Sequence, residues 1–161
     1  MREIAITKMA QRHSNTVDIY VDGSSRGNPG PSAIGIVAYA SEDKEHALYE
    51  YAAYIGIATN NIAEYEALIH ALTWIAKAKT SRATIHLDSE LFYKQITGAY
   101  RVKNARMAVQ LKRVKQLTER VNATAFHLIP REHNKHANRI AQKASQTHKS
   151  TRKKFTQETL L

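Results

Sequence analysis

The order of apolar segments along the chain is the feature that most constrains its fold. Three apolar runs, at residues 17–21, 33–40 and 46–57, follow one another with short polar connections. Short connections favour antiparallel neighbours, so these runs predict a three-stranded meander. A helical segment separates them from a fourth run at residues 83–87, and a strand, a helix and a strand in succession predict a right-handed crossover to a parallel strand. The sequence therefore predicts an α/β fold with a mixed sheet, to which residues 124–129 add a fifth strand.

Three longer helices and one short one are indicated by the spacing of apolar residues. The first follows Thr59, Asn60 and Asn61, whose short polar side chains are suited to cap a helix. Its buried stripe is predicted to consist of Tyr65, Leu68, Ile69, Leu72, Ile75 and Ala76. A short helix is expected between Ser89 and about Thr97, an amphipathic basic helix over residues 106–121, and a last helix over residues 134–145.

The chain divides into three parts by composition. Residues 17–146 carry all the periodic patterns and are predicted to form one domain. Residues 1–16 are too short and too polar for a second domain, so we expect a loosely attached N-terminal arm. Residues 147–161 are basic and lack periodicity, which predicts a mobile C-terminal tail.

Charge indicates the class of partner. The 161 residues include 24 Lys and Arg against 14 Asp and Glu, which gives a formal net charge of +10 and favours a polyanion, most simply nucleic acid. The absence of cysteine excludes disulfides and thiolate metal sites. No apolar run approaches the ~18 residues of a membrane span, and the first residues lack the apolar block of a signal peptide. A cytoplasmic protein without a membrane partner is expected.

Two aspartates follow predicted strands in equivalent positions. Asp22 follows the first strand and opens a turn rich in Gly and Ser, and Asp88 follows the fourth strand. Ligands of open α/β sheets gather beyond the carboxyl ends of strands, so a shared site is predicted there. A hairpin turn or a helix cap would account for either aspartate alone. Glu64 is placed at the edge of the buried helical stripe, in the first turn, where it could equally complement the helix dipole.

Four short strings together resemble one family. DGSSRGNPG at residues 22–30, TNNIAE at 59–64, DS at 88–89 and REHN at 131–134 are similar in order and spacing to ribonuclease H of type 1, over roughly residues 16–146. The resemblance implies a five-stranded mixed sheet, three antiparallel strands and then two parallel ones, flanked by helices. It implies hydrolysis of the RNA strand of RNA/DNA hybrids with two Mg²⁺ ions, for which Mn²⁺ is a substitute. Double-stranded RNA is the alternative partner, and no obligate protein partner is indicated.

The metal ligands implied by the resemblance are Asp22, Glu64 and Asp88, and a fourth carboxylate of the family falls at position 138, which holds Asn. Two divalent cations repel each other and need anionic oxygen ligands. Asn138 retains a carbonyl oxygen as a metal ligand but removes one charge, which forfeits roughly 4 kcal/mol of gross attraction to one ion at an effective dielectric near 20. Weaker metal binding and a reduced rate are therefore expected. His133 is the candidate for proton handling or product release, because imidazole changes charge near neutral pH.

Recognition of the hybrid is assigned to the two loops beside the metals and to the basic helix. An enzyme that cuts only RNA must sense the 2′-hydroxyl through backbone and amide groups. By resemblance, Thr59 and Asn104 would hold a phosphate of the DNA strand. The candidate substrate-binding residues are Gly23, Ser24, Asn28, Thr59, Asn60, Asn61, Asn104 and Arg106. The interval at residues 100–105 is too short for the tryptophan-containing basic handle of better-studied bacterial members, so a short form is expected.

Two further interpretations remain open at this point. The chain could be a noncatalytic member, natural or deliberately inactivated, that binds hybrid or double-stranded RNA, with Asn138 as its mark. It could also be the nuclease domain of a transposase or reverse transcriptase, although such domains usually belong to longer polypeptides.

Overall fold

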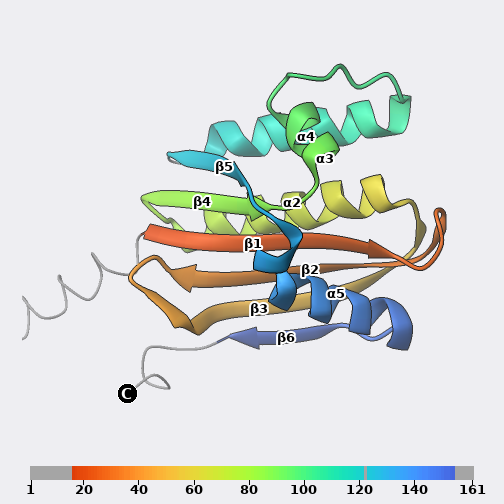
Figure 1. Ribbon diagram of the computed structural model, residues 1–161. Coiled ribbons are helices and arrows are strands. Elements are labelled where there is room, and N and C mark those ends of the chain that lie inside the picture. The colour runs from red at the N-terminus through yellow and green to blue at the C-terminus, as the bar shows by residue number, and fades with distance from the viewer. Residues whose placement is uncertain (1–15, 122, 155–161) are drawn as a thin grey trace, which may run out of the picture.

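The computed structural model describes residues 16–121 and 123–154, and in this part of the chain a single mixed sheet lies between helices (Figure 1). Strands β1 (Thr16–Ser25), β2 (Gly30–Ala40) and β3 (Asp43–Ala58) are antiparallel neighbours. Strands β4 (Arg82–Leu87) and β5 (Thr124–Leu128) extend the sheet in parallel on the other side of β1. The predicted arrangement of three antiparallel and two parallel strands is therefore confirmed.

A sixth strand corrects the predicted sheet. Strand β6 (Thr151–Lys154) pairs antiparallel with β3, which gives the order β5-β4-β1-β2-β3-β6 among the described strands. These residues were expected to belong to a mobile tail. Every residue of β6 is exposed. Its sequence, Thr-Arg-Lys-Lys, has no alternation of apolar and polar residues, which is the pattern that would predict a strand. The side chain of Arg152 lies over the ring of Tyr51, 5.0 Å from its centroid, and so helps to hold the edge strand in place.

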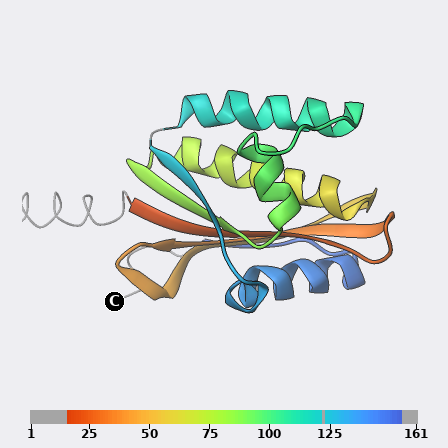
Figure 2. The ribbon, with the colours of Figure 1, turned by 45° about the horizontal axis from the view of Figure 1, so that its top comes forward.

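Helices cover both faces of the sheet (Figure 2). Helices α2 (Asn60–Ala78), α3 (Glu90–Ile96) and α4 (Ala105–Arg120) lie on one side, and α5 (Lys135–Thr147) packs on the other side against β1, β2 and β3. A short 3₁₀ helix, η1 (Arg131–His133), leads from β5 into α5. None of the described helices is both long and apolar enough to cross a membrane.

Helix α2 is the centre of the hydrophobic core. Thr59 caps it, since its Oγ1 accepts a hydrogen bond from the amide of Ile62 at 3.3 Å. The predicted stripe is confirmed except at Ala76, which is exposed. The buried residues of the helix are Ile62, Ala63, Tyr65, Ala67, Leu68, Ile69, Ala71, Leu72 and Ile75. The stripe is wide because the sheet covers one side of α2 and α4 another. Glu64 was expected in the first turn, but α2 begins at Asn60, so Glu64 is its fifth residue.

Helix α4 has the predicted amphipathic form. Val114 is its buried residue, and Met107, Leu111 and Leu117 pack against the core while partly exposed. The basic residues on its outer side are exposed, namely Arg106, Lys112, Arg113, Lys115 and Arg120. This helix therefore presents a row of cations to solvent.

The predicted division of the chain is only partly described. The expected N-terminal arm lies outside the described residues except for Thr16, which begins β1. Helix α5 continues to Thr147, one residue into the expected C-terminal tail. Residues 155–161 of that tail also lie outside the described part.

Candidate active site

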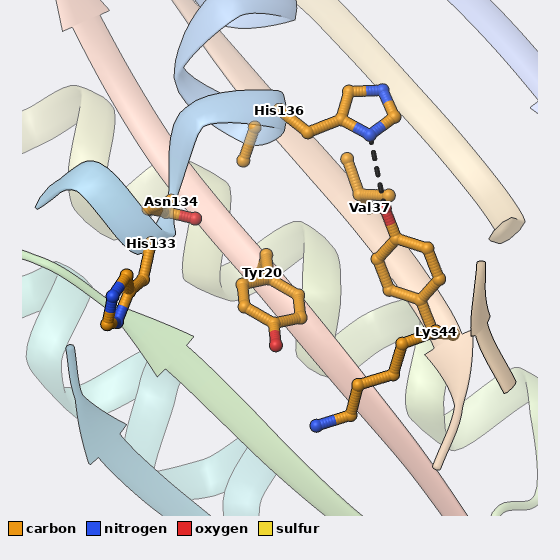
Figure 3. A pocket seen from close by; sticks show the side chains of 8 residues that line it. Tyr20, Val37, Lys44, His133, Asn134 and His136 are labelled. Atoms are coloured by element: carbon orange, nitrogen blue, oxygen red, sulfur yellow. Dashed lines mark hydrogen bonds between the residues drawn. The ribbon is translucent and has the colours of Figure 1, made fainter. Parts of the chain in front are cut away.

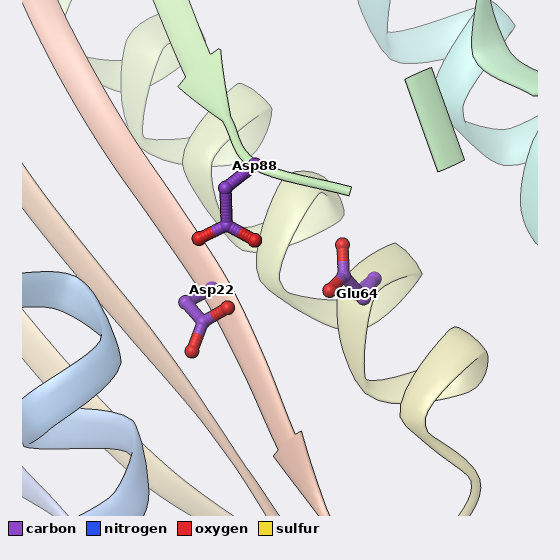
Figure 4. A group of neighbouring side chains, drawn as sticks. All are labelled: Asp22, Glu64 and Asp88. Atoms are coloured by element: carbon purple, nitrogen blue, oxygen red, sulfur yellow. The ribbon is translucent and has the colours of Figure 1, made fainter. Parts of the chain in front are cut away.

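Three carboxylates from distant parts of the sequence converge at one place. Asp22 lies in β1, Glu64 in α2, and Asp88 directly after β4 (Figure 4). One oxygen from each of the three lies within 4.8 Å of the others. Among the described residues this is the group of three or more His, Cys, Asp or Glu side chains with the geometry to hold a metal ion. The convergence predicted for Asp22 and Asp88 is present, and Glu64 joins them.

Asp22 lies within strand β1. The sequence had predicted a position after the end of the strand, so that prediction is wrong. Strand β1 continues to Ser25, because the pairing with β2 extends through Asp22 opposite Gly35 and through Gly23 opposite Ile34. Alternation along β1 places Val21 in the core below α2 and Asp22 on the face that carries α5.

Gly23 brings α2 close to Asp22. A Cβ atom at this position would lie 2.4 Å from both the carbonyl carbon of Ala63 and the amide nitrogen of Glu64. Any side chain at residue 23 would therefore push α2 away from β1. The glycine thus sets the distance between the backbone of Glu64 and that of Asp22.

Gly35 has the same role for α5. A Cβ atom on Gly35 would lie 2.3 Å from the carbonyl oxygen of Ala137. This close approach places Asn138 beside Asp22, and Asn138 Nδ2 donates a hydrogen bond to Asp22 Oδ2 at 2.9 Å. Asn138, at the position where the resemblance implies a fourth carboxylate, therefore contacts Asp22.

Burial and mutual repulsion raise the pKa values of two carboxyl groups in the acidic cluster. Burial, followed by the charge of Asp88, raises the pKa of Asp22 to about 7, although the hydrogen bond from Asn138 opposes this rise. Burial, and then the charges of Asp22 and Asp88, hold the pKa of Glu64 well above its ordinary value. Arg131 is the basic residue that offsets part of both shifts. A divalent cation bound by these oxygens would relieve the repulsion, so the residues present fit Mg²⁺ or Mn²⁺.

Asn134 is a site residue that the sequence prediction missed. Its Nδ2 donates to the carbonyl oxygen of Val21 and to Asp88 Oδ2, both at 2.9 Å, and the residue is 1% exposed. These bonds tie the Asp88 carboxylate to β1, next to Asp22. From the sequence, Asn134 was placed in the REHN string and at the start of the last helix without a role in the site, yet its side chain caps nothing. A buried asparagine at that place is visible only in three dimensions.

His133 lies at the end of η1 and is exposed. It lines a pocket of about 140 Å³ together with Tyr20, Lys44 and His136, on the sheet face that carries α5 (Figure 3). His133 is the neighbour of Asn134 in the chain. Among the described hydrogen bonds, none joins His133 to the three carboxylates. Its expected part in proton handling stays a prediction.

Most of the predicted substrate-binding residues line a second groove. A hollow of about 400 Å³ lies between the start of α2 and the start of α4, and its walls include Asn28, Thr59, Asn61, Asn104 and Arg106. Asn28 Oδ1 accepts a hydrogen bond from the amide of Asn60 at 3.1 Å and so joins the β1–β2 loop to α2. Gly23 and Ser24 lie outside this lining, within β1.

The N-termini of two helices face this groove. Thr59 caps α2, and Asn104 Oδ1 caps α4 by accepting from the amides of Arg106 and Met107 at 3.0 and 3.1 Å. The side chains of Asn28, Thr59 and Asn104 already pair several of the first amides. The dipoles of the two helices would still attract an anion at these N-termini. The groove therefore has the electrostatic character expected of a phosphate-binding surface.

The structure has a mixed sheet packed against the buried helix α2, and three carboxylates meet where β1, α2 and β4 approach one another. These features define a protein of the ribonuclease H-like class. A family model described as reverse transcriptase-like matches residues 20–144. The crystal structure of ribonuclease H1 from Halobacterium salinarum superposes with a TM-score of 0.77 at 35% identity, covering 82% of this chain and 98% of that one. The chain belongs to the ribonuclease H type 1 family.

Two further relatives define the extent of the match. LC11-RNase H1, isolated from compost and solved in complex with an RNA/DNA hybrid, is 37% identical with a TM-score of 0.74, covering 82% of this chain and 98% of that one. A bifunctional protein of Mycobacterium tuberculosis is 35% identical over 128 residues, which is 80% of this chain and 35% of that protein. The chain thus spans about a third of the length of the mycobacterial relative.

Proposed function

We propose that this chain is a ribonuclease H that hydrolyses the RNA strand of RNA/DNA hybrids with two Mg²⁺ ions. The observation that carries the proposal is the convergence of Asp22, Glu64 and Asp88, with ligand oxygens within 4.8 Å of one another. The folded unit responsible would be residues 17–146. The LC11 relative, solved with a bound hybrid, supports the choice of substrate.

The chain's own residues would bind and orient the cations. Asp22, Glu64 and Asp88 supply the anionic oxygens, and Asn134 fixes the direction of the Asp88 carboxylate through its hydrogen bond. When bound, the cations supply activation of the attacking water and stabilisation of the departing oxygen. His133, exposed beside the site, would exchange a proton with solvent or aid product release.

Asn138 would weaken this site without removing it. Its Nδ2 donates to Asp22 Oδ2, so a cation bound at that oxygen must compete with the hydrogen bond. The amide also lacks the negative charge that a carboxylate would contribute to two adjacent cations. We therefore propose that the enzyme is attenuated relative to members with four carboxylates.

The hybrid would lie along the groove between α2 and α4. The two helix N-termini at Thr59 and Asn104 face this groove, and Arg106 belongs to its wall. The exposed basic row of α4 continues from the groove and would add sequence-independent attraction to phosphates. Gly23, Ser24, Asn28, Asn60 and Asn61 are the proposed contacts to the RNA strand.

The discriminating experiment is cleavage of an end-labelled hybrid by the original chain and by Asn138→Asp, in Mg²⁺ and in Mn²⁺. We expect slow cleavage by the original chain and an increase of at least about tenfold for Asn138→Asp, because roughly 1.4 kcal/mol of recovered electrostatic stabilisation gives that factor. Asp88→Asn serves as the inactive control. If neither the original chain nor Asn138→Asp cleaves the hybrid, the proposal that this chain is a ribonuclease H is refuted.

The same experiment tests a noncatalytic alternative, which is favoured by the hydrogen bond from Asn138 to Asp22. A protein of this kind would bind hybrid or double-stranded RNA through the groove and α4 without cutting it. Its signature would be binding by the original chain, measured by fluorescence anisotropy, together with no cleavage by either form. Cleavage by Asn138→Asp alone would instead indicate a disabled site on an intact scaffold.

A further inference from the structure

Two histidines outside the acidic cluster face each other on neighbouring strands. His86 in β4 and His127 in β5 are direct partners in the parallel register. Their Nδ1 atoms lie 3.2 Å apart. His86 is buried, while His127 is exposed on the edge strand of the sheet. The pair shares no residue with the Asp22, Glu64 and Asp88 cluster.

The tautomer of His86 is set by a buried carboxylate. Asp18, which is 8% exposed, accepts a hydrogen bond from His86 Nε2 at 2.7 Å. Because the Nε2 proton points at this carboxylate, the lone pair of a neutral His86 resides on Nδ1, the atom that faces His127. A carboxylate behind the ring also increases the basicity of the opposite nitrogen.

The ring of His86 is also held in its plane. It stacks on Tyr20 with centroids 4.5 Å apart and an interplanar angle of 15°. Tyr20 lies in β1 directly opposite His86 in the parallel register. Hydrogen bond and stacking together restrain both the direction and the tilt of the imidazole, so its Nδ1 is preorganised towards His127.

The separation of the two nitrogens matches the spacing of metal ligands. Imidazole nitrogens at 2.0–2.1 Å from a tetrahedral Zn²⁺ lie about 3.3 Å from each other. A direct hydrogen bond between the rings would give a similar separation, with His127 as the donor. With a metal between them, His127 would carry its proton on Nε2, which its exposure on the edge strand permits.

We propose that His86 and His127 form a binding site for a transition-metal ion of the Zn²⁺, Ni²⁺ or Cu²⁺ class, with Asp18 as the residue that orients His86. Imidazole nitrogen suits these ions, whereas carboxylate oxygen suits Mg²⁺, so the two sites differ in metal preference. Two protein ligands leave the remaining positions to water. The ion at this site is therefore exchangeable, and the proposal does not depend on the nuclease function.

The test is calorimetric titration of Zn²⁺ into the full chain in a large excess of Mg²⁺, which competes for the carboxylates of the acidic cluster, so the site is identified by its loss in His127→Gln. We expect one Zn²⁺ per chain, a loss of affinity of at least about tenfold in His127→Gln, and a loss of about 10- to 100-fold in Asp18→Asn. His46→Gln is the matched control, because His46 is also bonded to a carboxylate, Asp43, but lies outside the pair. It should bind as the original chain does.

Two results would overturn the proposal. One is the absence of Zn²⁺ binding by the original chain in saturating Mg²⁺, and the other is unchanged affinity in His127→Gln. Nitrogen-15 spectra of the imidazoles give an independent readout, since Zn²⁺ should shift the Nδ1 resonances of His86 and His127 and leave His46 in place. Circular dichroism of His127→Gln confirms folding, which its exposed edge position favours.

Discussion

Asp22 is the residue at which burial and charge are most strongly opposed. It is 5% exposed, it faces two other carboxylates, and its pKa is raised to about 7. In the absence of a cation the native state therefore holds a proton that the unfolded chain releases near pH 4. The residue is costly for the metal-free fold and favourable only when a cation is bound.

This opposition predicts a pH dependence of stability. Because the folded pKa of Asp22 is raised from 3.8 to about 7, the free energy of unfolding of the metal-free protein should fall as pH rises through that window and level off above it. The contribution is at most about 4 kcal/mol, from about three pKa units. Asp22→Asn should reduce this fall, leaving the part that comes from the raised pKa of Glu64, and should be more stable than the original chain at pH 8, as measured by urea unfolding in EDTA.

Asp43 provides the control for that measurement. It is exposed, and its hydrogen bond with His46 lowers its pKa, so Asp43→Asn should leave the slope between pH 4 and 7 unchanged. Saturating Mg²⁺ should remove the fall in stability for the original chain, since the cation replaces the proton. A metal-free protein whose stability is the same at pH 5 and pH 8 in both forms would contradict this account of Asp22.

At the scale of elements, the site depends on how closely α2 and α5 approach the sheet. Gly35 is the partner of Asp22 on β2 and Gly23 is the next residue of β1, and neither position leaves room for a Cβ atom. One glycine sets the position of Glu64 and the other that of Asn138. The backbone thus fixes the geometry of the cluster before any side chain rotates.

Substitution of Gly23 should therefore damage both stability and metal binding. In Gly23→Ala the new methyl group would lie only 2.4 Å from backbone atoms of Ala63 and Glu64, so it would displace the α2 backbone there. We expect a loss of about 1–3 kcal/mol of stability from overpacking and at least a tenfold weaker Mn²⁺ affinity. Ser24→Ala, at the next position of β1, is the control and should change neither quantity appreciably. Equal Mn²⁺ affinity in Gly23→Ala and the original chain would show that the glycine does not position Glu64.

Most of the secondary-structure elements could be predicted from the sequence alone. The five apolar strands, the cap at Thr59 and the basic row of α4 follow from periodicity and local chemistry, and all three are present. Strand β6 escaped prediction because both of its faces are exposed and polar. The position of Asp22 within β1 escaped because glycine and serine are poor strand residues, and here pairing with β2 extends the strand through them.

The site was predicted only as far as its chemistry is visible in the sequence. Asp22 and Asp88 were expected to meet because each follows an apolar run, and Glu64 joined them through the resemblance. Asn134 was missed because its partners, Val21 and Asp88, are far away in the sequence. The pairing of His86 with His127 depends on strand register, which no local pattern specifies.

At the scale of the whole molecule, the net charge of +10 determines how the protein should meet nucleic acid. The exposed cations of α4 lie beside the groove that begins at Thr59 and Asn104. Binding through such a surface releases counterions, so hybrid affinity should fall steeply as KCl is raised. Affinity that does not change with KCl would refute the electrostatic account.

A variant of α4 should reduce that salt dependence. Lys112→Ala removes one exposed cation, and the slope of log affinity against log salt should fall by about one if the residue contacts a phosphate. Lys79→Ala, at the far end of α2, removes the same charge away from the groove and should leave the slope unchanged. Equal slopes for the two variants would assign the attraction to net charge alone.

The central claim is that Asp22, Glu64 and Asp88 together bind divalent cations. The most direct measurement is anomalous scattering from crystals of the original chain soaked in Mn²⁺. The account predicts at least one Mn²⁺ within bonding distance of oxygens from all three carboxylates. Crystals in which Mn²⁺ is absent from this cluster, or in which one of the three side chains points away from the ion bound by the other two, would contradict it.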